Sequence, residues 1–338
     1  MPVTIKDIAR IANVSITTVS RVLNNKSEGI GDDTRKKVLS IIQELDYRPN
    51  SIARSMITKK TNTIGLIIPD IRNPFFPELV RGAEDVAKQS NYNIFLCNTD
   101  GDKASETEYI QLMQEKSVDG IIFTHSYATL SKQIEALANQ HNTPIVLLDR
   151  GLDDDQFSGV YIDNEKAGYL ATKFLLELNH VKIGCITGPS HIPNSNKRLK
   201  GYAKALDEWG IVVNQNVIIQ GDYQWEGGYV AAKQLLQKEK VSAIFAFNDL
   251  MAFGVYQAAG ELGMRIPDDL SVIGFDNLKY NEFMNPRLTT IDQSTYKMGE
   301  AAIQLLLKQI EAEEAFEHQT IYLEPNLIVR ESCMRYET

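Results

Sequence analysis

The spacing of hydrophobic positions changes along the chain near residue 60. Before it, the stretches TIKDIARIA, ITTVSRVLNN and DDTRKKVLSIIQELDY place apolar residues three or four positions apart. This spacing predicts three short helices, each with one buried face. The predicted inward residues are Ile5, Ile8, Ala9, Ala12, Val19, Val22, Leu23, Val38, Ile41, Ile42 and Leu45.

Short polar residues mark where these helices begin. Thr4 is followed three residues later by Asp7, which predicts a variant of the capping box. The segment NVS at 13–15 predicts a tight turn with a second cap at Ser15. For the third helix we expect a cap near Asp32 or Asp33.

From residue 63 onward, short apolar runs alternate with helical patterns. The runs include TIGLIIPD, NIFLCNTD, GIIFTHS, PIVLLDR, IGCITGP, AIFAFND and LSVIGFDN. This alternation is typical of βαβ units and of a parallel sheet covered on both faces. The first run predicts a buried strand over 63–68, and the number of runs favours two similar lobes. GVYIDN and LTTIDQ are candidate crossings between the lobes.

We therefore expect an all-α helix-turn-helix head followed by an α/β body with two doubly wound parallel-sheet lobes. The head spans 1–48, a hinge helix or linker spans 49–60, and the body spans 61–338. We place the first lobe at about 61–162 and 293–318, and the second at about 163–290 and 319–338.

The distribution of charged residues also changes near residue 60. Residues 1–60 carry 11 Lys/Arg against 6 Asp/Glu, whereas the remaining residues carry 24 against 38. A basic head on an acidic body suggests that the head meets a polyanion. The three cysteines are far apart, so we expect neither disulfides nor a metal site. MPVTIKDIAR has no apolar h-region and no apolar run is long enough to span a membrane, so we expect a cytoplasmic protein.

Motifs for catalysis are missing from the sequence. We find no G-x-G-x-x-G after the first strand, no Walker A loop, no G-x-S-x-G and no HExxH. The histidines are scattered, and we interpret His191 as a surface residue near the predicted cleft. We therefore expect a protein that is not an enzyme and has no cofactor.

Two short helices joined by a tight turn are the outline of a helix-turn-helix, whose second helix enters the DNA major groove. Ile16 and Thr17 stand at the start of that helix, where base edges are reached. Arg21, one turn later, can pair bidentately with guanine. The predicted DNA-binding set also includes Ser15, the cap of this helix. Its remaining members are short polar residues suited to phosphate oxygens: Thr4, Thr18, Ser20 and Asn24. A small helical bundle with solvated Arg and Thr residues is the alternative.

The sequence motifs of the head resemble those of a known protein family. TIKDIARIANVSITTVSRVLNN resembles the N-terminal motif of the lactose-repressor (LacI/GalR) family of bacterial regulators, and YRPNSIARSM resembles the hinge that follows it. The resemblance continues through TIGLIIPDIRNPFF, VDGIIF, IGFDN and LTTIDQ, so it covers essentially the whole chain. It implies a dimeric repressor that binds a near-palindromic operator and responds to a small molecule.

The resemblance assigns a role to SIARSM, which is too short to be a stable helix alone. In the family this hinge becomes a helix on DNA, where two copies enter the minor groove and an apolar residue wedges between base steps. The matching positions are Asn50, Ser51, Ala53, Arg54 and Met56. The resemblance places the wedge at Met56, where the family usually has Leu. The alternative is a linker residue that packs on the first strand.

Polar and aromatic residues gather at the predicted strand ends, where open α/β sheets bind ligands. They offer flat faces and bidentate hydrogen-bonding groups, which together suit a sugar. Because the two arginines balance two aspartates, a neutral polyol fits better than a phosphorylated ligand. Phe75 or Phe76 could instead be core, and Asp276 could cap a turn. The set is Asn73, Phe75, Phe76, Asp149, Arg150, Asn196, Arg198, Tyr223, Asn248, Asp276 and Gln293.

The resemblance narrows this ligand further. The body is similar to periplasmic sugar-binding proteins, above all ribose binders. FLCNTDGD and CITGP likewise resemble ribose-operon repressors. The Asp149–Arg150 pair differs from that of the purine-binding branch. Two alternatives stay open: a global catabolite regulator controlled by a phosphoprotein partner, and a cytoplasmic sugar-binding protein without DNA contacts.

Overall fold

The computed structural model describes residues 3–23, 28–47, 55, 60–127, 136, 143–151, 156–312 and 316–337. The chain divides into two compact units, Met1–Thr61 and Asn62–Thr338, which we call the head and the body. No helix among the described residues is both long and apolar enough to cross a membrane.

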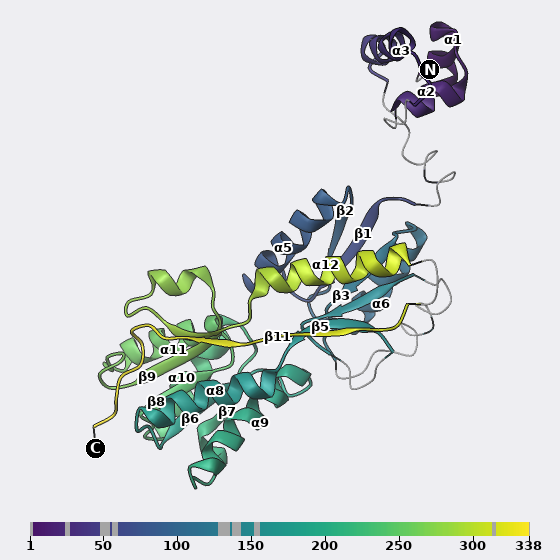
Figure 1. The fold of residues 1–338 in the computed structure, drawn as a ribbon. Helices are drawn as coiled ribbons and strands as arrows, with labels where there is room; N and C mark the ends of the chain where they lie inside the picture. The colour runs from purple at the N-terminus through teal and green to yellow at the C-terminus, as the bar shows by residue number, and fades with distance from the viewer. Residues whose placement is uncertain are drawn as a thin grey trace. The chain divides into compact units, whose positions relative to one another are not determined.

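The head contains the helices α1 (Ile5–Ala12), α2 (Ile16–Leu23) and α3 (Asp32–Glu44) (Figure 1). The predicted capping box is confirmed: the Asp7 backbone N–H donates to the Thr4 hydroxyl, and the Thr4 N–H donates to the Asp7 carboxylate. Asn13 ends α1 in the left-handed conformation at φ 57°. Ser15 then caps α2 by accepting from the Thr18 N–H at 3.0 Å. The first two helices are therefore fixed by local hydrogen bonds.

One predicted cap of the head is wrong. The N-cap of α3 is Gly31, and no side chain caps it. Asp32 and Asp33 instead lie in the first turn, where their charge interacts favourably with the helix dipole. Seven residues of the predicted inward set form the buried core of the head: Ile8, Ala9, Ala12, Val19, Val22, Val38 and Ile41. Ile5, Leu23, Ile42 and Leu45 pack on this core while partly buried.

The body contains two six-stranded sheets within its described residues (Figure 1). The first sheet has the order β11-β5-β4-β3-β1-β2, and all its neighbouring strands are parallel. The predicted buried strand over 63–68 is confirmed as β1. The elements of this first lobe are β1 (Thr63–Ile68), α5 (Phe75–Gln89), β2 (Asn93–Asn98), α6 (Lys103–Glu115), β3 (Gly120–Phe123), β4 (Ile145–Leu148), β5 (Ser158–Ile162), α12 (Thr295–Glu311) and β11 (Thr320–Leu323).

The second sheet has the order β12-β10-β9-β8-β6-β7 and is parallel except for β12, which pairs antiparallel with β10. Its central strands are apolar and fully buried because helices cover both faces. The elements of this second lobe are α8 (Asn164–Glu177), β6 (Ile183–Thr187), α9 (Pro193–Glu208), η1 (Gln215–Val217), β7 (Ile218–Gln220), α10 (Trp225–Lys238), β8 (Ala243–Ala246), α11 (Asp249–Glu261), β9 (Ser271–Asp276), η2 (Lys279–Phe283), β10 (Thr289–Asp292) and β12 (Asn326–Ile328).

The chain crosses between the lobes three times within its described part. Two crossings lie where we expected them, after β5 and after β10. The third corrects our boundary, because β11 pairs with β5 in the first sheet and not with the second lobe. The crossing therefore falls at residues 324–325, where Pro325 separates the two terminal strands.

Two helices of the second lobe approach each other very closely. Helix α8 packs on α9, and a Cβ added at Gly168 would lie 2.3 Å from the Arg198 carbonyl oxygen. Only glycine permits this approach, because any side chain would push α9 away. The packing fixes the position of Arg198, whose side chain enters the site described next.

Candidate functional site

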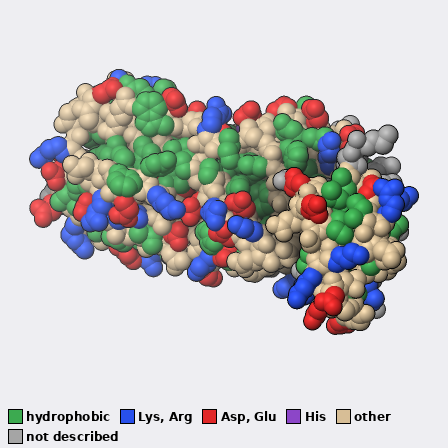
Figure 2. Space-filling view, turned by 90° about the horizontal axis from the view of Figure 1, so that it is seen from above, with side chains coloured by type: hydrophobic (Ala, Val, Ile, Leu, Met, Phe, Trp, Pro, Cys, Tyr) green, Lys and Arg blue, Asp and Glu red, His purple; other side chains and the backbone are tan. Residues whose placement is uncertain are grey.

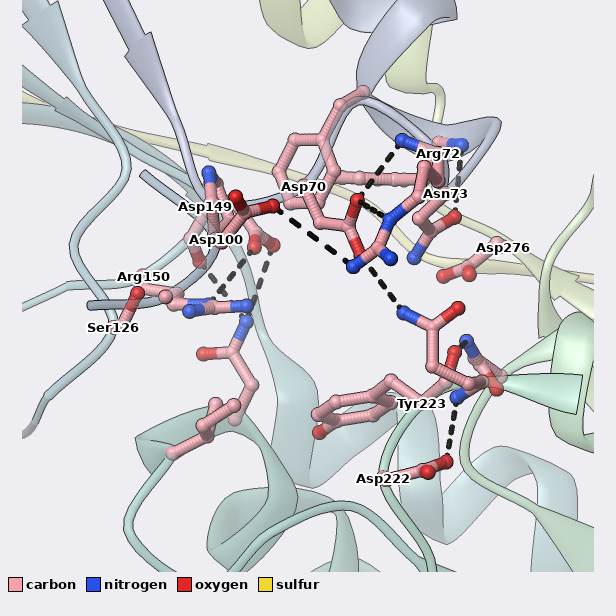
Figure 3. Close-up of a pocket in the computed structure, with 18 of the residues that line it drawn as sticks. Asp70, Arg72, Asn73, Asp100, Ser126, Asp149, Arg150, Asp222, Tyr223 and Asp276 are labelled. Carbon is pink, nitrogen blue, oxygen red and sulfur yellow. Dashed lines mark hydrogen bonds and ion pairs between the residues drawn. The ribbon is translucent and has the colours of Figure 1, made fainter. Parts of the chain in front are cut away.

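A cavity of about 420 Å³ lies between the two lobes, at the carboxyl ends of their strands. Both lobes contribute side chains to its wall (Figure 3). Ten of the eleven predicted ligand residues line it: Asn73, Phe75, Phe76, Asp149, Arg150, Arg198, Tyr223, Asn248, Asp276 and Gln293. Residues that lie far apart in the sequence are therefore brought to one place by the parallel topology.

Phe75 and Phe76 form an apolar wall at the start of α5. Their rings meet edge to face, with centroids 5.0 Å apart and an interplanar angle of 85°. Both rings are buried and belong to the hydrophobic core of the body, and both also border the cavity. Both phenylalanines are therefore core residues, as the alternative interpretation expected for one of them, and both also form part of the cavity wall.

Asp149 and Arg150 follow β4 and are both buried. Arg150 Nε lies 3.6 Å from Asp149 Oδ2, and Arg150 Nη1 donates to the His125 carbonyl oxygen at 3.1 Å. Asn194 of the second lobe donates to Asp149 Oδ1 at 3.1 Å. Burial raises the pKa of Asp149, although Arg150 and Arg198 oppose the shift. The carboxyl group is thus held in a fixed position by both lobes.

Asp276 ends β9 on the other side of the cavity (Figure 3). Gln293, at the crossing after β10, donates from Nε2 to Asp276 Oδ1 at 2.5 Å. Burial raises the pKa of Asp276 well above its usual value, although Arg198 opposes the shift. Asp276 therefore does more than cap a turn. Its carboxylate accepts a hydrogen bond from Gln293, a side chain that also lines the cavity.

Arg198 is held rigidly between these groups. Its Nε donates to Asn164 Oδ1 at 2.8 Å, and its Nη1 donates to the Phe247 carbonyl oxygen. The guanidinium carbon stands 3.5 Å from the centroid of the Phe275 ring, which gives a cation–π contact. A charged donor is therefore fixed at the cavity wall.

Three residues of the wall have a strained backbone. Asp149, Tyr223 and Asp276 have φ values of 65°, 67° and 116°. Such values cost a non-glycine residue about 1–3 kcal/mol and cluster at functional sites. All three residues line the same cavity.

Several buried polar atoms of the wall have no hydrogen-bond partner within the described residues. Ser126 Oγ and Gln293 Oε1 are two of them. Tyr223 Oη is a third; the neighbouring Ser195 hydroxyl donates its one proton to the Gly188 carbonyl oxygen at 2.9 Å and so has none to donate to Tyr223 Oη. Buried polar groups are nearly always paired, so these three atoms mark where a polar ligand can bond.

Asn196 does not line the cavity, and its predicted placement is wrong. It is exposed on α9 and donates to the Ser190 carbonyl oxygen at 2.8 Å. Asn194 takes the place we expected for it and is buried against Asp149. The helical period explains this, because Asn194 lies four residues before Arg198 on the same face.

Asn73 and Asn248 line the cavity and also hold the backbone. Asn248 Oδ1 caps α11 by accepting from the Met251 N–H at 2.9 Å, while its Nδ2 donates to the Tyr223 carbonyl oxygen at 2.8 Å. Asn73 Oδ1 accepts from the Phe75 N–H at 3.0 Å. Asn248 therefore positions Tyr223, and Asn73 positions the aromatic wall.

A second group of residues that were not predicted from the sequence also lines the cavity. They include Asp70, Arg72, Asp100, Ser126, Tyr127, Asp222 and Gln224. Asp70, Asp100 and Ser126 follow β1, β2 and β3, so the strand-end rule that found the others could have found them. His191, interpreted as a surface residue, is exposed but also borders the cavity and stacks on Tyr127 at 5.5 Å.

In the head, the predicted contacts for base edges are exposed on α2. Ile16, Thr17 and Arg21 point to solvent, and no hydrogen bond or ion pair with a described residue engages Arg21. Ser15 and Thr18 share a hydrogen bond of 2.9 Å between their hydroxyls, and Thr4 is committed to its cap. Ser20 is half-buried. Asn24, Asn50, Ser51, Ala53, Arg54 and Met56 lie outside the described residues.

Comparison with known proteins covers both units. Residues 4–50 match the family model of bacterial regulatory proteins, lacI family, and residues 61–326 match that of periplasmic binding proteins and the sugar binding domain of the LacI family. The transcriptional repressor PurR of Photobacterium profundum is 38% identical over 97% of this chain and 98% of its own. Catabolite control protein A of Priestia megaterium is 42% identical over 93% of this chain and 94% of its own.

Solved structures agree with this assignment. The lac repressor dimer bound to operator and the anti-inducer ONPF has a TM-score of 0.87 at 26% identity, over 99% of this chain and 100% of that one. A LacI family regulator from Enterococcus faecium with bound ribose has a TM-score of 0.75 at 33% identity, over 81% of this chain and 100% of that one. The two curated relatives are not named as ribose-operon repressors, so the expected likeness to that branch is corrected to a likeness to the family.

Proposed function

The chain belongs to the LacI family of bacterial regulatory proteins, and from this premise we propose that it is a repressor released from its operator by a small neutral sugar. A ribose-like pentose is the favoured effector. The protein acts in the cytoplasm as a homodimer on a near-palindromic operator that controls carbohydrate utilisation. The observation that carries the proposal is the set of unpartnered polar atoms facing the cavity.

A sugar supplies what these atoms lack. Ser126 Oγ, Tyr223 Oη and Gln293 Oε1 each need a partner that is a donor or an acceptor, and a sugar hydroxyl is both. Asp149 and Asp276 lie on opposite sides of the same space and can each accept from hydroxyls (Figure 3). The faces of Phe75 and Phe76 suit the C–H surface of a sugar ring.

The charge of the wall argues against a phosphorylated effector. Its aspartates are Asp70, Asp100, Asp149, Asp222 and Asp276, and its arginines are Arg72, Arg150 and Arg198. Each arginine faces at least one of these carboxyl groups through an ion pair or a Coulombic interaction. A phosphate would bring negative charge to a site without cationic excess, so a neutral polyol is favoured.

Ribose is supported by one similar structure and by the size of the cavity. The Enterococcus faecium regulator binds ribose and is 33% identical to this chain. A cavity of about 420 Å³ is near the lower end of the range for small-molecule sites, which favours a single ring.

The two-lobed body provides a way to couple sugar and operator. Because side chains from both lobes face one cavity, a sugar bridging them changes the preferred orientation of the lobes. The similar lac repressor binds its operator as a dimer. In this chain, hydrophobic side chains gather along one face of the body (Figure 2), and the exposed Val230, Tyr280 and Phe283 are candidates for a dimer contact.

A second candidate is a global catabolite regulator whose body responds mainly to a phosphoprotein. The 42% identity to catabolite control protein A favours it. The cavity argues for a direct sugar effector, because a regulator driven only by a protein partner has no need of unpartnered polar atoms in a buried cleft.

Calorimetric titration of the full chain with pentoses, hexoses, their phosphates and nucleobases tests the proposal. We expect a neutral sugar to bind and its phosphate ester not to bind. Binding of a sugar phosphate or a nucleobase alone would contradict the neutral-sugar assignment. Tighter operator binding in the presence of a phosphoprotein, with no response to any sugar, would favour the second candidate.

A further inference from the structure

The outer part of the cavity wall is bridged directly from one lobe to the other. The residues concerned, Asp70, Arg72, Tyr127, His191 and Gln224, are half-buried or exposed, unlike the buried residues of the inner wall. Asp70 follows β1 and Tyr127 follows the β3 region in the first lobe, whereas Gln224 and His191 precede α10 and α9 in the second. Two separate pairs therefore span the cleft near solvent.

The first pair is Asp70 with Gln224. Gln224 Nε2 donates to Asp70 Oδ2 at 2.9 Å, a bond drawn from Asp70 across the cavity in Figure 3. Arg72 holds the same carboxylate in a fork, from Nε to Oδ1 at 2.9 Å and from Nη2 to Oδ2 at 3.1 Å. Partial burial opposes ionisation of Asp70, but the bonds from Arg72 outweigh it and lower the pKa of the carboxyl.

Gln224 is itself positioned from the second lobe. Its backbone N–H donates to Asp222 Oδ1 at 2.8 Å, and it is the N-cap residue of α10. The amide group therefore projects from a fixed helix end to a fixed carboxylate. A hydrogen bond to an ionised acceptor between two preorganised groups is stronger than a neutral one.

The second pair is Tyr127 with His191. Their rings stack across the cleft, with centroids 5.5 Å apart and an interplanar angle of 28°. The Lys103 ammonium lies 5.6 Å from the centre of the Tyr127 ring. This separation leaves no room for a ligand ring between Tyr127 and His191, so the stack closes its side of the cavity and does not itself form a binding slot.

We propose that Gln224 and His191 determine the size of the effector, because their bridges to Asp70 and Tyr127 enclose one sugar ring and exclude a second. This inference rests on the proposed function, since it names the size class of the sugar that the same cavity takes. A ligand of two linked rings has to extend through the outer wall, and it can do so only if a bridge is broken. The bridges also slow the escape of an enclosed ring.

The test compares full-length protein with Gln224→Ala, His191→Ala and the double variant. Gln234→Ala is the matched control, because Gln234 is exposed on α10 and does not line the cavity. Calorimetry measures the affinities for ribose and glucose as single-ring probes and for cellobiose as the two-ring probe. Stopped-flow mixing measures the dissociation rate of the bound single-ring sugar. Circular dichroism checks that each variant is folded.

We expect the wild type to bind a single-ring probe and to bind cellobiose far more weakly. In the double variant the single-ring sugar dissociates about tenfold faster or more, and the ratio of cellobiose to single-ring affinity rises about tenfold. The control leaves both quantities unchanged. A purely structural role would lower both affinities together and would not change their ratio.

Three results would overturn the inference. Wild-type protein that binds cellobiose as tightly as the single rings has no size limit, although its sugar-binding function stands. Folded variants with an unchanged ratio and rate show that the bridges do not control entry, again with the function intact. Wild-type protein that binds neither these three probes nor any other neutral sugar in the calorimetric screen contradicts the proposed function itself, and the inference falls with it.

Discussion

The head and the body use polar side chains in opposite ways. In the head, Ile16, Thr17 and Arg21 are exposed on the surface of α2, and a small apolar core only fixes the helix that carries them. In the body, Asp149 and Asp276 are buried, strained and held by groups from facing elements. Under the proposed function, the head presents its polar groups outward to operator DNA, whereas the body directs them into a cavity for a small molecule.

This difference teaches where each unit is vulnerable. DNA contacts on a helix surface can be removed without disturbing a core, but the small core itself can be lost easily. The proposed ligand contacts inside the body are part of a hydrogen-bonded wall, while the surrounding core is large. Substitutions should therefore separate operator binding from sugar binding cleanly, and each experiment below tests that separation.

The largest effect is expected from the core of the head. Ile8 is fully buried in α1, and Ile8→Ala removes about 2–5 kcal/mol of stability. A unit of this size has only a few kcal/mol in total, so the head unfolds. Gel-shift assays should show operator binding lost, while calorimetry shows sugar binding unchanged. Loss of both activities would show that the two units do not fold independently.

The next effect is expected from the inner wall of the cavity. Asp276→Ala removes a buried acceptor and leaves Gln293 Nε2 without its partner. We expect sugar affinity to fall about 100-fold or more, and operator binding without sugar to stay within about twofold. Asp207→Ala, at an exposed position of α9, is the control. If Asp276→Ala instead prevents folding, as circular dichroism would reveal, the role of Asp276 is structural.

A smaller effect is expected from the exposed face of α2. Arg21→Ala should weaken operator binding by about 1–3 kcal/mol and relax the preference for one base pair in each half-site. Arg35→Ala, which removes the same charge from an exposed position of α3, should act weakly and on all sequences alike. Binding-site selection measures the preference. Uniform weakening by Arg21→Ala would mean that Arg21 contacts only phosphate.

The smallest effect is expected in the hinge. Met56 lies outside the described residues, so its role as a wedge remains a prediction. Met56→Leu should keep or tighten operator binding, because Leu fills the same gap more rigidly. Met56→Ala should weaken it several-fold in fluorescence anisotropy at fixed salt. Equal affinities for all three proteins would exclude Met56 as the wedge.

The sequence predicted the fold because its local signals agree with its long-range pairing. The capping box of Thr4 and Asp7 and the apolar run of β1 are local features, and both are confirmed. Our prediction for the terminal strand β11 in the second lobe is wrong, because its alternation of apolar residues fits the edge of either sheet. Only its pairing with β5 across the chain decides the lobe.

Site residues that directly follow a strand were predictable from the sequence. Site residues whose place depends on the direction of a side chain were not. Asp149 and Asp276 directly follow apolar runs, so their place at one sheet edge was predictable. The sequence predicts Asn196 in the site where the structure has Asn194, because sequence alone leaves the first residue of α9 open. Pro193 begins that helix and sets the phase that turns Asn194 inward. The bridge from Gln224 to Asp70 joins two lobes, and no local pattern indicates it.

Operator affinity measured with and without the sugar tests the central claim most directly. With full-length protein at fixed salt, saturating ribose, or the single-ring sugar that calorimetry identifies, should weaken operator binding by about 5- to 150-fold. The same sugar should have no effect on the Asp276→Ala variant. An operator affinity that does not change when the sugar occupies the cavity would contradict the account.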